Sequence, residues 1–436
     1  MSFRPNLASG LFFAEKAGKH LFLNPAIPNW IIVNRNAALL LSKCDGKTPV
    51  SKIAVSCGAS VPEVEELLRR AAECGVVGEF QALSIELEDD CSCGKSEEKQ
   101  WTDVGPTQLQ IVHWKLTNSC DLRCRYCYAE SGRVSDHMSL SELSRVAREV
   151  NEISPSVEHV LSGGEPLLHP GALEFAELLK EHGNRVSLLT NGTRIDARNA
   201  VRIANLADRI KISLDGSTED IHAKTRGTGN HAAAVRAIDL LMERGADIQV
   251  AMTVHRGNLN DVGAMTRRFG SRLTFQPLFQ AGRGADRNEL ALTGEEYYDA
   301  LAAIDDVAPM AAIGTVLENL RGRGAKRCAL AAAEISISET GDVYPCQLLT
   351  STKFAAGNVC ETPLAEIYFN SAVLAKARSV SIDSLRKCQE CPIRLLCAGG
   401  CRARDFYEVG SIEEVGDFCE YEQRAFFHGL FDSAII

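Results

Sequence analysis

Residues 116–130 read LTNSCDLRCRYCYAE and place Cys120, Cys124 and Cys127 on one short segment. The spacing is C-x3-C-x2-C, and the aromatic Tyr126 directly precedes the third cysteine. Three thiolates on one loop can hold three irons of a cubic [4Fe–4S] cluster, because thiolates are the usual ligands of such clusters. The fourth iron would then lack a protein ligand. Half of a structural zinc site is the alternative, but such sites use four nitrogen or sulfur ligands, and no fourth cysteine or histidine lies in this loop.

The three-cysteine loop resembles the signature of the radical S-adenosylmethionine (SAM) superfamily. By this resemblance, the open iron chelates the amine and the carboxylate of the methionyl group of SAM. The cluster then donates one electron to the sulfonium, and the resulting 5′-deoxyadenosyl radical abstracts a hydrogen atom. An external one-electron reductant such as flavodoxin or ferredoxin is therefore an expected partner. The spacing by itself indicates only a site with three thiolates.

The composition is that of a soluble protein, since 45% of the 436 residues are hydrophobic and 24% are charged. A net charge of −10 argues against nucleic acid or an anionic membrane as partner, because both favour basic proteins. No apolar run reaches the ~18 residues that span a bilayer. The start of the chain lacks the pattern of a signal peptide, so a cytoplasmic location is expected. Sixteen cysteines in a reducing compartment then favour metal or cluster ligation over disulfides.

Residues 1–82 are predicted to form a small, winged-helix-like α+β domain. Two short strands, HLFLNP and NWIIVN, precede three helices; Thr48 and Pro49 are expected to cap and begin the second, and Ser60 to start the third. The pattern resembles the PqqD-like domain that holds the leader of a precursor peptide in many peptide-modifying enzymes. Leader capture by strand addition is thus one interpretation. An inert structural domain and a DNA-binding winged helix are the alternatives, although the segment has no dense basic run.

Residues 83–107 are acidic and polar and are predicted to be a linker, in which Cys91 and Cys93 either ligate metal or are incidental. From residue 108 to residue 320 (108–320), six strand-like runs alternate with helix-like runs. Such βα repeats predict a parallel sheet, closed as a barrel or open and doubly wound. The family resemblance selects an α/β fold with a partial (β/α)6 TIM barrel. In such barrels the active site lies at the carboxyl ends of the strands.

Polar motifs follow the predicted strands. Gly163, Gly164 and Glu165, after the second strand, resemble the GGEP motif of the superfamily, which implies that they hold the methionyl amine of SAM. Glycines let the main chain approach a ligand closely, and a carboxylate offsets an ammonium charge. Ser213 and Asp215 alternate onto one face at the end of the fourth strand. By the resemblance they bind the ribose hydroxyls, and the alternative is a capping serine with a turn aspartate.

Four further residues are assigned to SAM. Arg226 matches an arginine that pairs with the methionyl carboxylate in relatives, a role that suits its fork of donors. Asn258 lies where relatives have polar groups that face the adenosyl part, and the backbone of Tyr126 would contact the adenine edge. Asn191, in the Thr-Asn-Gly sequence after the third strand, is a turn signal and a weaker candidate. No acid–base pair is evident, so the catalytic residue that removes a substrate proton is not identified.

Residues 321–436 carry a second cysteine pattern, C-x2-C-x5-C-x3-C, with further cysteines on both sides. It resembles the SPASM domain, a C-terminal extension with two auxiliary iron–sulfur clusters, and one or two zinc knuckles are the alternative. By this resemblance the outer cluster and the inner cluster, both expected to be [4Fe–4S], have separate ligands. The outer set is Cys388, Cys391, Cys397 and Cys419, and the inner set is Cys328, Cys346 and Cys401.

The inner set has one ligand fewer than the fullest form of the pattern. Relatives often have another cysteine six residues after the first, and Glu334 occupies that position here. The inner cluster therefore either keeps an open iron or recruits Cys360 or Glu334. An open iron could bind the sulfur of a substrate cysteine, as proposed for some thioether-forming relatives.

These resemblances imply a radical SAM peptide maturase, similar to sactisynthases, that installs a thioether or carbon–carbon cross-link in a ribosomally synthesised precursor peptide, whereas the motifs themselves report cofactor binding and not the product. The N-terminal domain would bind the leader, the barrel would cleave SAM, and the auxiliary clusters would accept the second substrate electron. Maturases of sulfatases and enzymes that act on tetrapyrroles or small cofactors share the same core and tail and are alternatives. A non-enzymatic alternative is an iron–sulfur sensor whose winged helix binds DNA.

Overall fold

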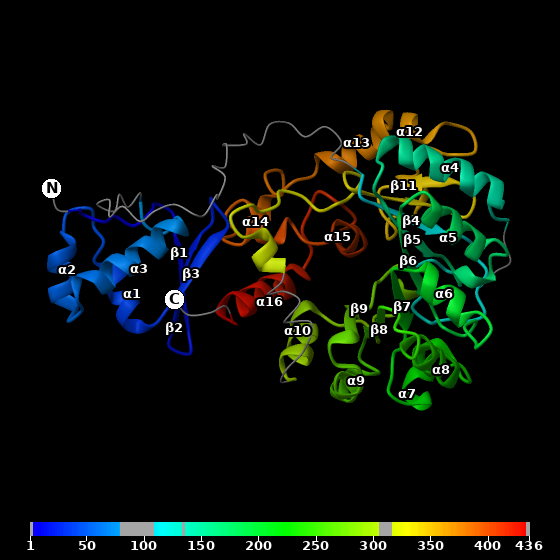
Figure 1. Cartoon of the computed structure of the whole chain (residues 1–436), viewed down its shortest axis with the longest axis horizontal. Coiled ribbons are helices and arrows are strands. Elements are labelled where there is room, and N and C mark those ends of the chain that lie inside the picture. Colours follow the sequence, from blue (N-terminus) through cyan, green and yellow to red (C-terminus); the bar gives the residue numbers. More distant parts are fainter. Residues whose placement is uncertain (1–2, 79–108, 133–135, 305–315, 433–436) are drawn as a thin grey trace.

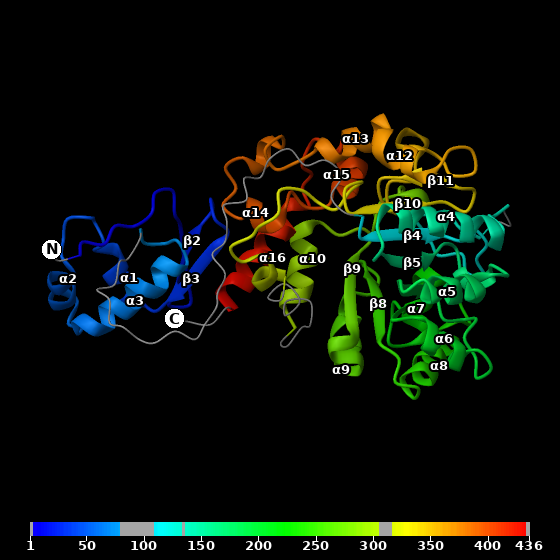
Figure 2. The same cartoon turned by 45° about the horizontal axis from the view of Figure 1, so that its top comes forward.

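The computed structural model of the chain describes residues 3–78, 109–132, 136–304 and 316–432. The N-terminal domain lies at one end, the barrel at the other, and helices from the last third of the chain lie between them (Figures 1 and 2). Cys91 and Cys93 lie outside the described residues. Within the described ranges, no helix is both long enough and apolar enough to cross a membrane.

A mixed nine-stranded sheet contains the six parallel strands expected from the sequence. These six strands pair in chain order, and helices cover their outer face (Figure 2). The predicted partial (β/α)6 barrel is confirmed. The strands are β4 (Ile111–Lys115), β5 (Glu158–Ser162), β6 (Arg185–Thr190), β7 (Arg209–Ser213), β8 (Ile248–Val254) and β9 (Leu273–Pro277). The helices after them are α4 (Leu140–Ile153), α5 (Ala172–Glu181), α6 (Ala200–Leu206), α7 (Glu219–Arg226), α8 (His231–Met242), α9 (Val262–Phe269) and α10 (Gly294–Ala302).

The first barrel helix shows how the sequence specifies these elements. Ser139 caps α4 by accepting a hydrogen bond from the Glu142 amide, and the Glu142 carboxylate accepts one from the Ser139 amide in return. Its apolar residues recur every three or four positions and so share the face turned to the sheet. They are Leu143, Val146, Ala147 and Val150, all buried.

The interior of the barrel wall is closely packed around Trp114 of β4. Its ring lies edge-on to Phe175 of α5 with the ring centroids 5.0 Å apart, and its Nε1 donates to Nδ1 of His159 (2.9 Å). Because burial lowers the pKa of His159 to about 3, this histidine is neutral at physiological pH. The packing holds β4 and β5 in register, and the loops after these two strands carry the signature cysteines and the Gly-Gly-Glu motif.

The C-terminal third adds three strands to the same sheet. β10 pairs in parallel with β4 and places Glu334 beside Ile111, and β11 and β12 continue the sheet in antiparallel order. The sequence analysis ended the barrel at residue 320 and did not predict these strands, none of which exceeds four residues. They bring Cys328 and Cys346, which flank β10 and β11, to the side of β4. The elements of this region are β10 (Glu334–Ile337), β11 (Asp342–Tyr344), β12 (Gly357–Asn358), α12 (Leu364–Asn370), α13 (Ala372–Ser379), α14 (Arg394–Cys397), α15 (Arg402–Val409) and α16 (Cys419–Asp432).

The N-terminal domain has three antiparallel strands and three helices, and the sequence analysis missed its first strand. Helix α3 begins after Ser60 as predicted. Helix α2 begins one residue later than predicted, because Thr48 bonds the Asp45 carboxylate through its amide and its hydroxyl, and Pro49 becomes the N-cap. The elements are β1 (Phe12–Lys16), β2 (Lys19–Asn24), β3 (Asn29–Val33), α1 (Arg35–Ser42), α2 (Val50–Cys57) and α3 (Val61–Glu73).

Both faces of this small sheet are covered. Its side chains alternate between a core shared with α1–α3 and a second core shared with the C-terminal helix α16. The helix-facing residues are Phe22, Ile31 and Val33. The residues that pack with Phe426 and Leu430 of α16 are Leu21, Leu23, Trp30 and Ile32. The N-terminal domain is thus joined to the cysteine-rich region by an apolar contact.

Candidate active site

A cavity of about 660 Å³ lies inside the barrel and extends to the carboxyl ends of its strands. An open groove between α9 and α10 contains none of the predicted site residues. Most of the residues assigned to the cluster and to SAM line the cavity: Cys120, Cys124, Tyr126, Cys127, Gly163, Gly164, Asn191, Ser213 and Arg226. Three others are buried behind its wall: Glu165, Asp215 and Asn258.

The two glycines of the Gly-Gly-Glu motif pack directly on the backbone of the cysteine loop. The Gly164 amide donates to the Thr117 carbonyl (2.7 Å), and the Glu165 amide donates to the Ser119 carbonyl (2.9 Å). A Cβ atom on Gly163 would lie 2.5 Å from the Thr117 carbonyl oxygen, and one on Gly164 would lie 2.2 Å from that of Ser119. Only glycine allows this approach. The sequence analysis expected the glycines to face a ligand, and the contact that requires them is with the loop itself.

The loop after β9 holds the cysteine loop from the other side. The Arg283 amide donates to the Cys127 carbonyl (3.0 Å), and its Nε donates to the Cys124 carbonyl (2.9 Å). A Cβ atom on Gly282 would lie 2.4 Å from the Tyr128 carbonyl oxygen. The sequence analysis missed these residues, although a Gly-Arg-Gly sequence after the sixth predicted strand was a usable signal.

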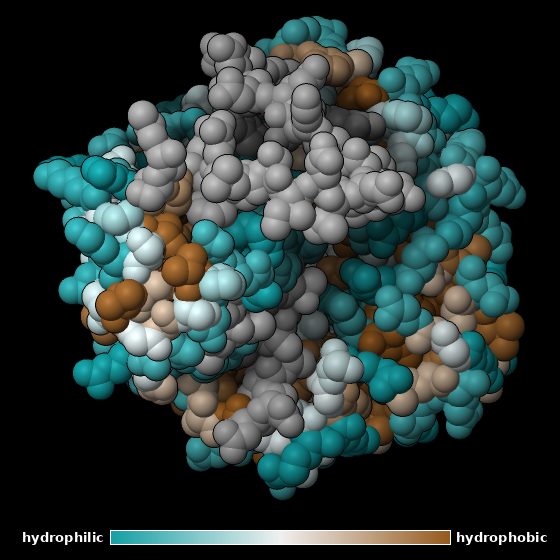
Figure 3. Space-filling view, turned by 60° about the vertical axis from the view of Figure 1, so that its left-hand side comes forward, coloured by the Kyte–Doolittle hydropathy of each residue, from teal (hydrophilic) through white to brown (hydrophobic). Residues whose placement is uncertain are grey.

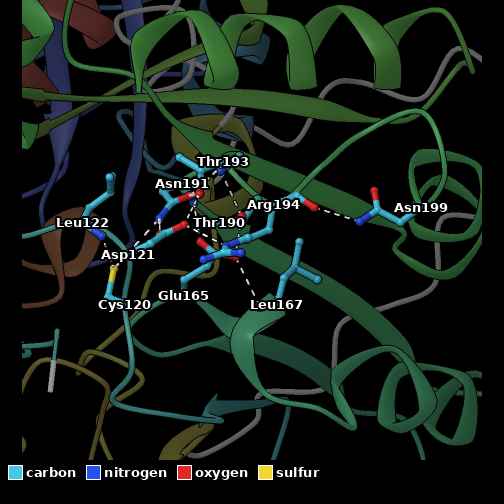
Figure 4. Close-up of polar contacts among 11 residues, drawn as sticks. Cys120, Asp121, Leu122, Glu165, Leu167, Thr190, Asn191, Thr193, Arg194 and Asn199 are labelled. Carbon is cyan, nitrogen blue, oxygen red and sulfur yellow. Dashed lines mark hydrogen bonds and ion pairs between the residues drawn. The ribbon is translucent and has the colours of Figure 1, made fainter. Parts of the chain in front are cut away.

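Asp121 connects the cysteine loop to the loop after β6 (Figure 4). Its Oδ1 accepts from Asn191 Nδ2 (2.9 Å), and its Oδ2 accepts from Thr193 Oγ1 (2.7 Å) and Arg194 Nε (2.9 Å). Burial acts to raise the pKa of Asp121, but these bonds outweigh it and hold the pKa below its usual value. Asn191 Nδ2 also lies 3.9 Å from the Cys120 sulfur. Asn191 therefore positions the first cysteine.

Glu165 follows β5 in the chain, and its buried side chain contacts the end of the neighbouring strand β6. Its Oε1 accepts from Thr190 Oγ1 (2.8 Å) and its Oε2 from the Asn191 amide (2.8 Å). Burial raises the pKa of Glu165 to about 7 against the effect of these hydrogen bonds. The carboxylate has no ion-pair partner among the described residues, so its surroundings favour a cation nearby.

Asp215 and Arg226 form a buried ion pair beside the cavity. Arg226 Nε lies 2.7 Å from Asp215 Oδ2, which also accepts a hydrogen bond from the Tyr126 hydroxyl, and Asp215 Oδ1 accepts from the Thr253 amide (3.0 Å). The protein therefore engages both oxygens of Asp215. The guanidinium extends to 4.0 Å from the Cys124 sulfur. Asp215 thus directs Arg226 toward the cysteine loop.

Asn258 connects the end of β7 to the end of β8, next to the ion pair of Asp215 and Arg226. Its Nδ2 donates to the carbonyls of Asp215 (2.9 Å) and Thr253 (2.8 Å), and its Oδ1 accepts from the His255 amide (2.8 Å). Asn258 therefore supports the wall of the cavity without lining it. His222 lies in the same wall, where its Nδ1 accepts from the Asp215 amide (3.1 Å).

The C-terminal cysteines come together around α14, α15 and α16. Three successive residues with left-handed backbone, Ala398, Gly399 and Gly400, turn the chain sharply between Cys397 and Cys401. One small pocket is lined by five of the predicted ligands: Cys388, Cys391, Cys397, Cys401 and Cys419.

Cys328 and Cys346 adjoin Cys401 at the edge of the barrel. The pKa of the Cys346 thiol lies well above its usual value, because of burial first, then the Glu334 carboxylate, and then the Cys328 and Cys401 thiols. The Ala331 amide donates to the Pro345 carbonyl (2.9 Å), which joins the segment after Cys328 to the residue before Cys346, and the three inner cysteines pack against one apolar core.

Cys360 lies apart from this group. Its exposed thiol is 4.0 Å from the Thr340 carbonyl, which precedes β11, whereas Cys346 follows that strand. Strand β11 (Asp342–Tyr344) therefore separates Cys360 from Cys346. The structure does not bring Cys360 to the inner set.

Comparison with known proteins places these features in a family. Residues 114–268 match the radical SAM superfamily, and residues 328–392 match the SPASM iron–sulfur cluster-binding domain. The mycofactocin maturase MftC of Mycobacterium ulcerans (strain Agy99) is 30% identical over 328 residues, which cover 67% of this chain and 83% of that protein. The chain belongs to the radical SAM superfamily. It is an enzyme whose radical SAM domain binds a [4Fe–4S] cluster and SAM and whose SPASM domain binds auxiliary iron–sulfur clusters, as the sequence predicted.

Two further similarities extend over more of this radical SAM enzyme. The AdoMet-dependent heme synthase of Oleidesulfovibrio alaskensis (strain ATCC BAA-1058 / DSM 17464 / G20) is 27% identical over 353 residues, or 73% of this chain and 89% of that protein. The fold resembles that of Streptococcus suis SuiB bound to its precursor peptide SuiA, with a TM-score of 0.57 at 14% identity. The aligned part covers 95% of this chain and all of SuiB, so the likeness in fold includes the N-terminal domain.

The donor groups of the radical SAM enzyme suit the cofactors of its family. Burial raises the pKa of Cys120 to about 12 and that of Cys388 to about 11, so these thiols ionise only beside positive charge such as that of iron. No three His, Cys, Asp or Glu side chains in the described ranges converge closely enough to hold a single metal ion. The ligands of a cubic cluster bind separate irons and stand farther apart. Two charged groups also suit the methionyl group of SAM. The buried Glu165 carboxylate has no ion-pair partner among the described residues and complements the amine. The Arg226 guanidinium projects toward the cysteine loop and complements the carboxylate.

Proposed function

We propose that this enzyme is a peptide maturase that installs a thioether or carbon–carbon cross-link in a ribosomally synthesised precursor peptide. Two of the similar proteins support a peptide substrate. MftC is named as a maturase, and SuiB was solved with a precursor peptide.

The observation that carries this proposal is that one cavity is lined by both cysteine regions. The signature loop forms one part of its wall, and Gln347 and Leu348, directly after Cys346, form another together with Arg404, shortly after Cys401. A substrate in this cavity would lie between the two regions. Forming a cross-link removes two hydrogen atoms from the peptide, so an acceptor for the second electron is needed near the site of hydrogen abstraction. A cluster held by the inner cysteines would lie in a suitable place to accept this second electron.

The proposal gives the residues around the signature loop separate tasks. When bound, the cluster and SAM supply the radical that abstracts the first hydrogen atom. Gly163 and Gly164 line the place of the methionyl amine, and the Glu165 carboxylate behind that wall supplies the negative charge that offsets it. Arg226 pairs with the carboxylate, and Ser213 contacts the ribose. Because both oxygens of Asp215 are engaged by protein groups, we assign it to orienting Arg226. Tyr126 contributes backbone contacts to the adenine.

We further propose that the N-terminal domain holds the leader of the peptide by strand addition at an edge of its three-stranded sheet. Strand β1 is an edge strand, and its outer side makes no backbone hydrogen bond within residues 3–78. Phe13 of this strand is 53% exposed. On the face seen in Figure 3, apolar side chains form small groups in a mainly hydrophilic surface, so a short extended segment fits better than a broad apolar partner.

The test is an anaerobic reaction of the reconstituted enzyme with SAM, reduced flavodoxin and each short peptide that the reading frames beside its gene encode. We expect the peptide to accelerate release of 5′-deoxyadenosine and to lose two hydrogens by mass. A leader-only peptide should compete for binding, and the leaderless core should react much more slowly. Release of 5′-deoxyadenosine with the peptide unchanged in mass would contradict peptide cross-linking.

An enzyme that acts on a tetrapyrrole is the second candidate, and the cationic wall of the cavity favours it. Arg209, Lys211 and Arg283 line the cavity, and Lys211 has no ion-pair partner among the described residues. Burial lowers the pKa of Lys211, so a bound carboxylate would stabilise its charged form. Tight binding of a tetrapyrrole carboxylate that is weakened in Lys211→Met, with no binding of the leader, would favour this candidate.

A further inference from the structure

A tight turn connects the first inner cysteine to the start of β10. The amides of Ala333 and Glu334 donate to the Ala329 carbonyl (2.9 and 3.1 Å), and the Leu330 amide donates to the Cys328 sulfur (3.4 Å). This folds the chain back on itself, so the backbone of residue 334 returns beside that of residue 328.

The same turn reaches the second inner cysteine. The Ala331 amide donates to the Pro345 carbonyl (2.9 Å), directly before Cys346. Ala331 has φ +55°, a left-handed conformation that is strained for alanine. The strained turn is held by these bonds, and it places Cys328, Glu334 and Cys346 together.

The Glu334 side chain extends from this turn toward His113 on the neighbouring strand β4. Glu334 pairs in register with Ile111 of β4, and Ile111 and His113 both line the central cavity. Its Oε1 lies 3.2 Å from His113 Nε2. Its Oε2 makes no hydrogen bond or ion pair with the part of the chain that the structure describes. One oxygen is therefore fixed and the other is available.

The donor groups of this region are the thiols of the three inner cysteines and the Glu334 carboxylate, and thiols bind iron as thiolates. Three thiolates and a carboxylate repel one another unless a polycationic group lies between them. This is the donor set of a cluster with one oxygen ligand.

Two other candidates for the fourth ligand are less well placed. Cys360 lies at the far end of β11, as described above. Glu339, at the other end of β10, has an ion pair with Lys115 (3.1 Å).

We propose that the Glu334 carboxylate binds the iron of the inner auxiliary cluster that Cys328, Cys346 and Cys401 leave without a thiolate. His113 positions this carboxylate from the barrel side. The inference concerns the cofactor site alone and holds for any substrate. An oxygen donates less electron density than a thiolate, so this cluster has a higher potential than it would with four cysteines, as replacement of thiolates by histidine raises the potential of other clusters.

The test uses a background in which Cys120, Cys124 and Cys127 are changed to Ala, so that only auxiliary clusters remain. This protein should hold about eight irons. In Glu334→Gln, which keeps the shape of the side chain, we expect loss of about one iron per chain and a [3Fe–4S] signal in the EPR spectrum after oxidation. Glu334→Cys should restore the iron and remove the Mössbauer component of the oxygen-bound iron, with a lower midpoint potential.

Glu339→Ala and Cys360→Ala are the matched controls and should leave iron content and spectra unchanged. His113→Phe should keep the iron but alter the EPR signal, which a merely structural residue would not do. The proposal is overturned if Glu334→Gln keeps the iron count and the spectra of the background, or if Cys360→Ala loses the iron instead. Identical Mössbauer spectra of Glu334→Cys and the background would also overturn it.

Discussion

Gly164→Ala adds a single methyl group at the contact between the Gly-Gly-Glu motif and the cysteine loop. That carbon would lie 2.2 Å from the Ser119 carbonyl oxygen and 2.9 Å from that of Asn118, both of which are backbone atoms. The loop must therefore move away, which breaks the bonds from the Gly164 and Glu165 amides to Thr117 and Ser119. Overpacking costs about 1–3 kcal/mol, and each hydrogen bond contributes about 0.5–1.5 kcal/mol. Together they predict roughly 4 kcal/mol of local destabilisation.

The local effect is measured by hydrogen exchange of the segment that contains residues 163–165 and by anaerobic iron counting. Exchange should become about a thousandfold faster, because 1.4 kcal/mol corresponds to a factor of ten, and the protein should lose about four irons. Gly263→Ala is the control. Its Cβ would meet only the end of the Arg267 side chain (3.4 Å), and alanine favours the α9 helix by about 1 kcal/mol. If Gly164→Ala keeps the exchange rate and iron content of the parent, steric closeness of the two loops is not what holds the cysteines.

Three other substitutions test separate parts of the structure. Asp121→Ala removes three hydrogen bonds from the cysteine loop and should speed iron loss to a chelator, whereas Asp196→Ala, at an exposed ion pair, should not. Arg226→Gln leaves Asp215 buried without its cation, so we expect a loss of about 3–5 kcal/mol of stability and weaker SAM binding by calorimetry; unchanged melting would contradict a buried ion pair. Burial lowers the pKa of His159 to about 3, against ~6.5 in the unfolded chain. The contribution of the neutral ring to the free energy of unfolding is therefore complete above pH ~6.5. It decreases as the pH is lowered, by about 1.4 kcal/mol at pH 5.5. His159→Asn should therefore reduce the drop in melting temperature between about pH 7.5 and 5.5, and an equal drop in both proteins would refute this.

The six parallel strands could be predicted from the sequence because each is a local apolar run bounded by turn residues, and the family resemblance then selected the barrel over an open sheet. The strands β10–β12 could not, because they have two to four residues and exist through pairing that begins at β4, more than two hundred residues earlier in the chain. A long separation in sequence also explains Arg283, which holds Cys124 and Cys127 from a loop after the last barrel strand, 159 residues beyond Cys124. The sequence around Arg283 does not indicate which carbonyl groups this residue binds.

The cysteine spacing by itself determined the donor chemistry of this protein, because three thiols on a short loop lie within reach of one another in any fold that the loop can adopt. The alternation of apolar strand-like and helix-like runs also determined a parallel α/β sheet, and the family resemblance selected the barrel among the possible closures. Only the tertiary structure decided which groups stand beside those thiols. Asp215 faces Arg226, Glu334 joins the inner cysteines, and Cys360 is held away from them, because these placements depend on strand pairing and burial across distant parts of the chain.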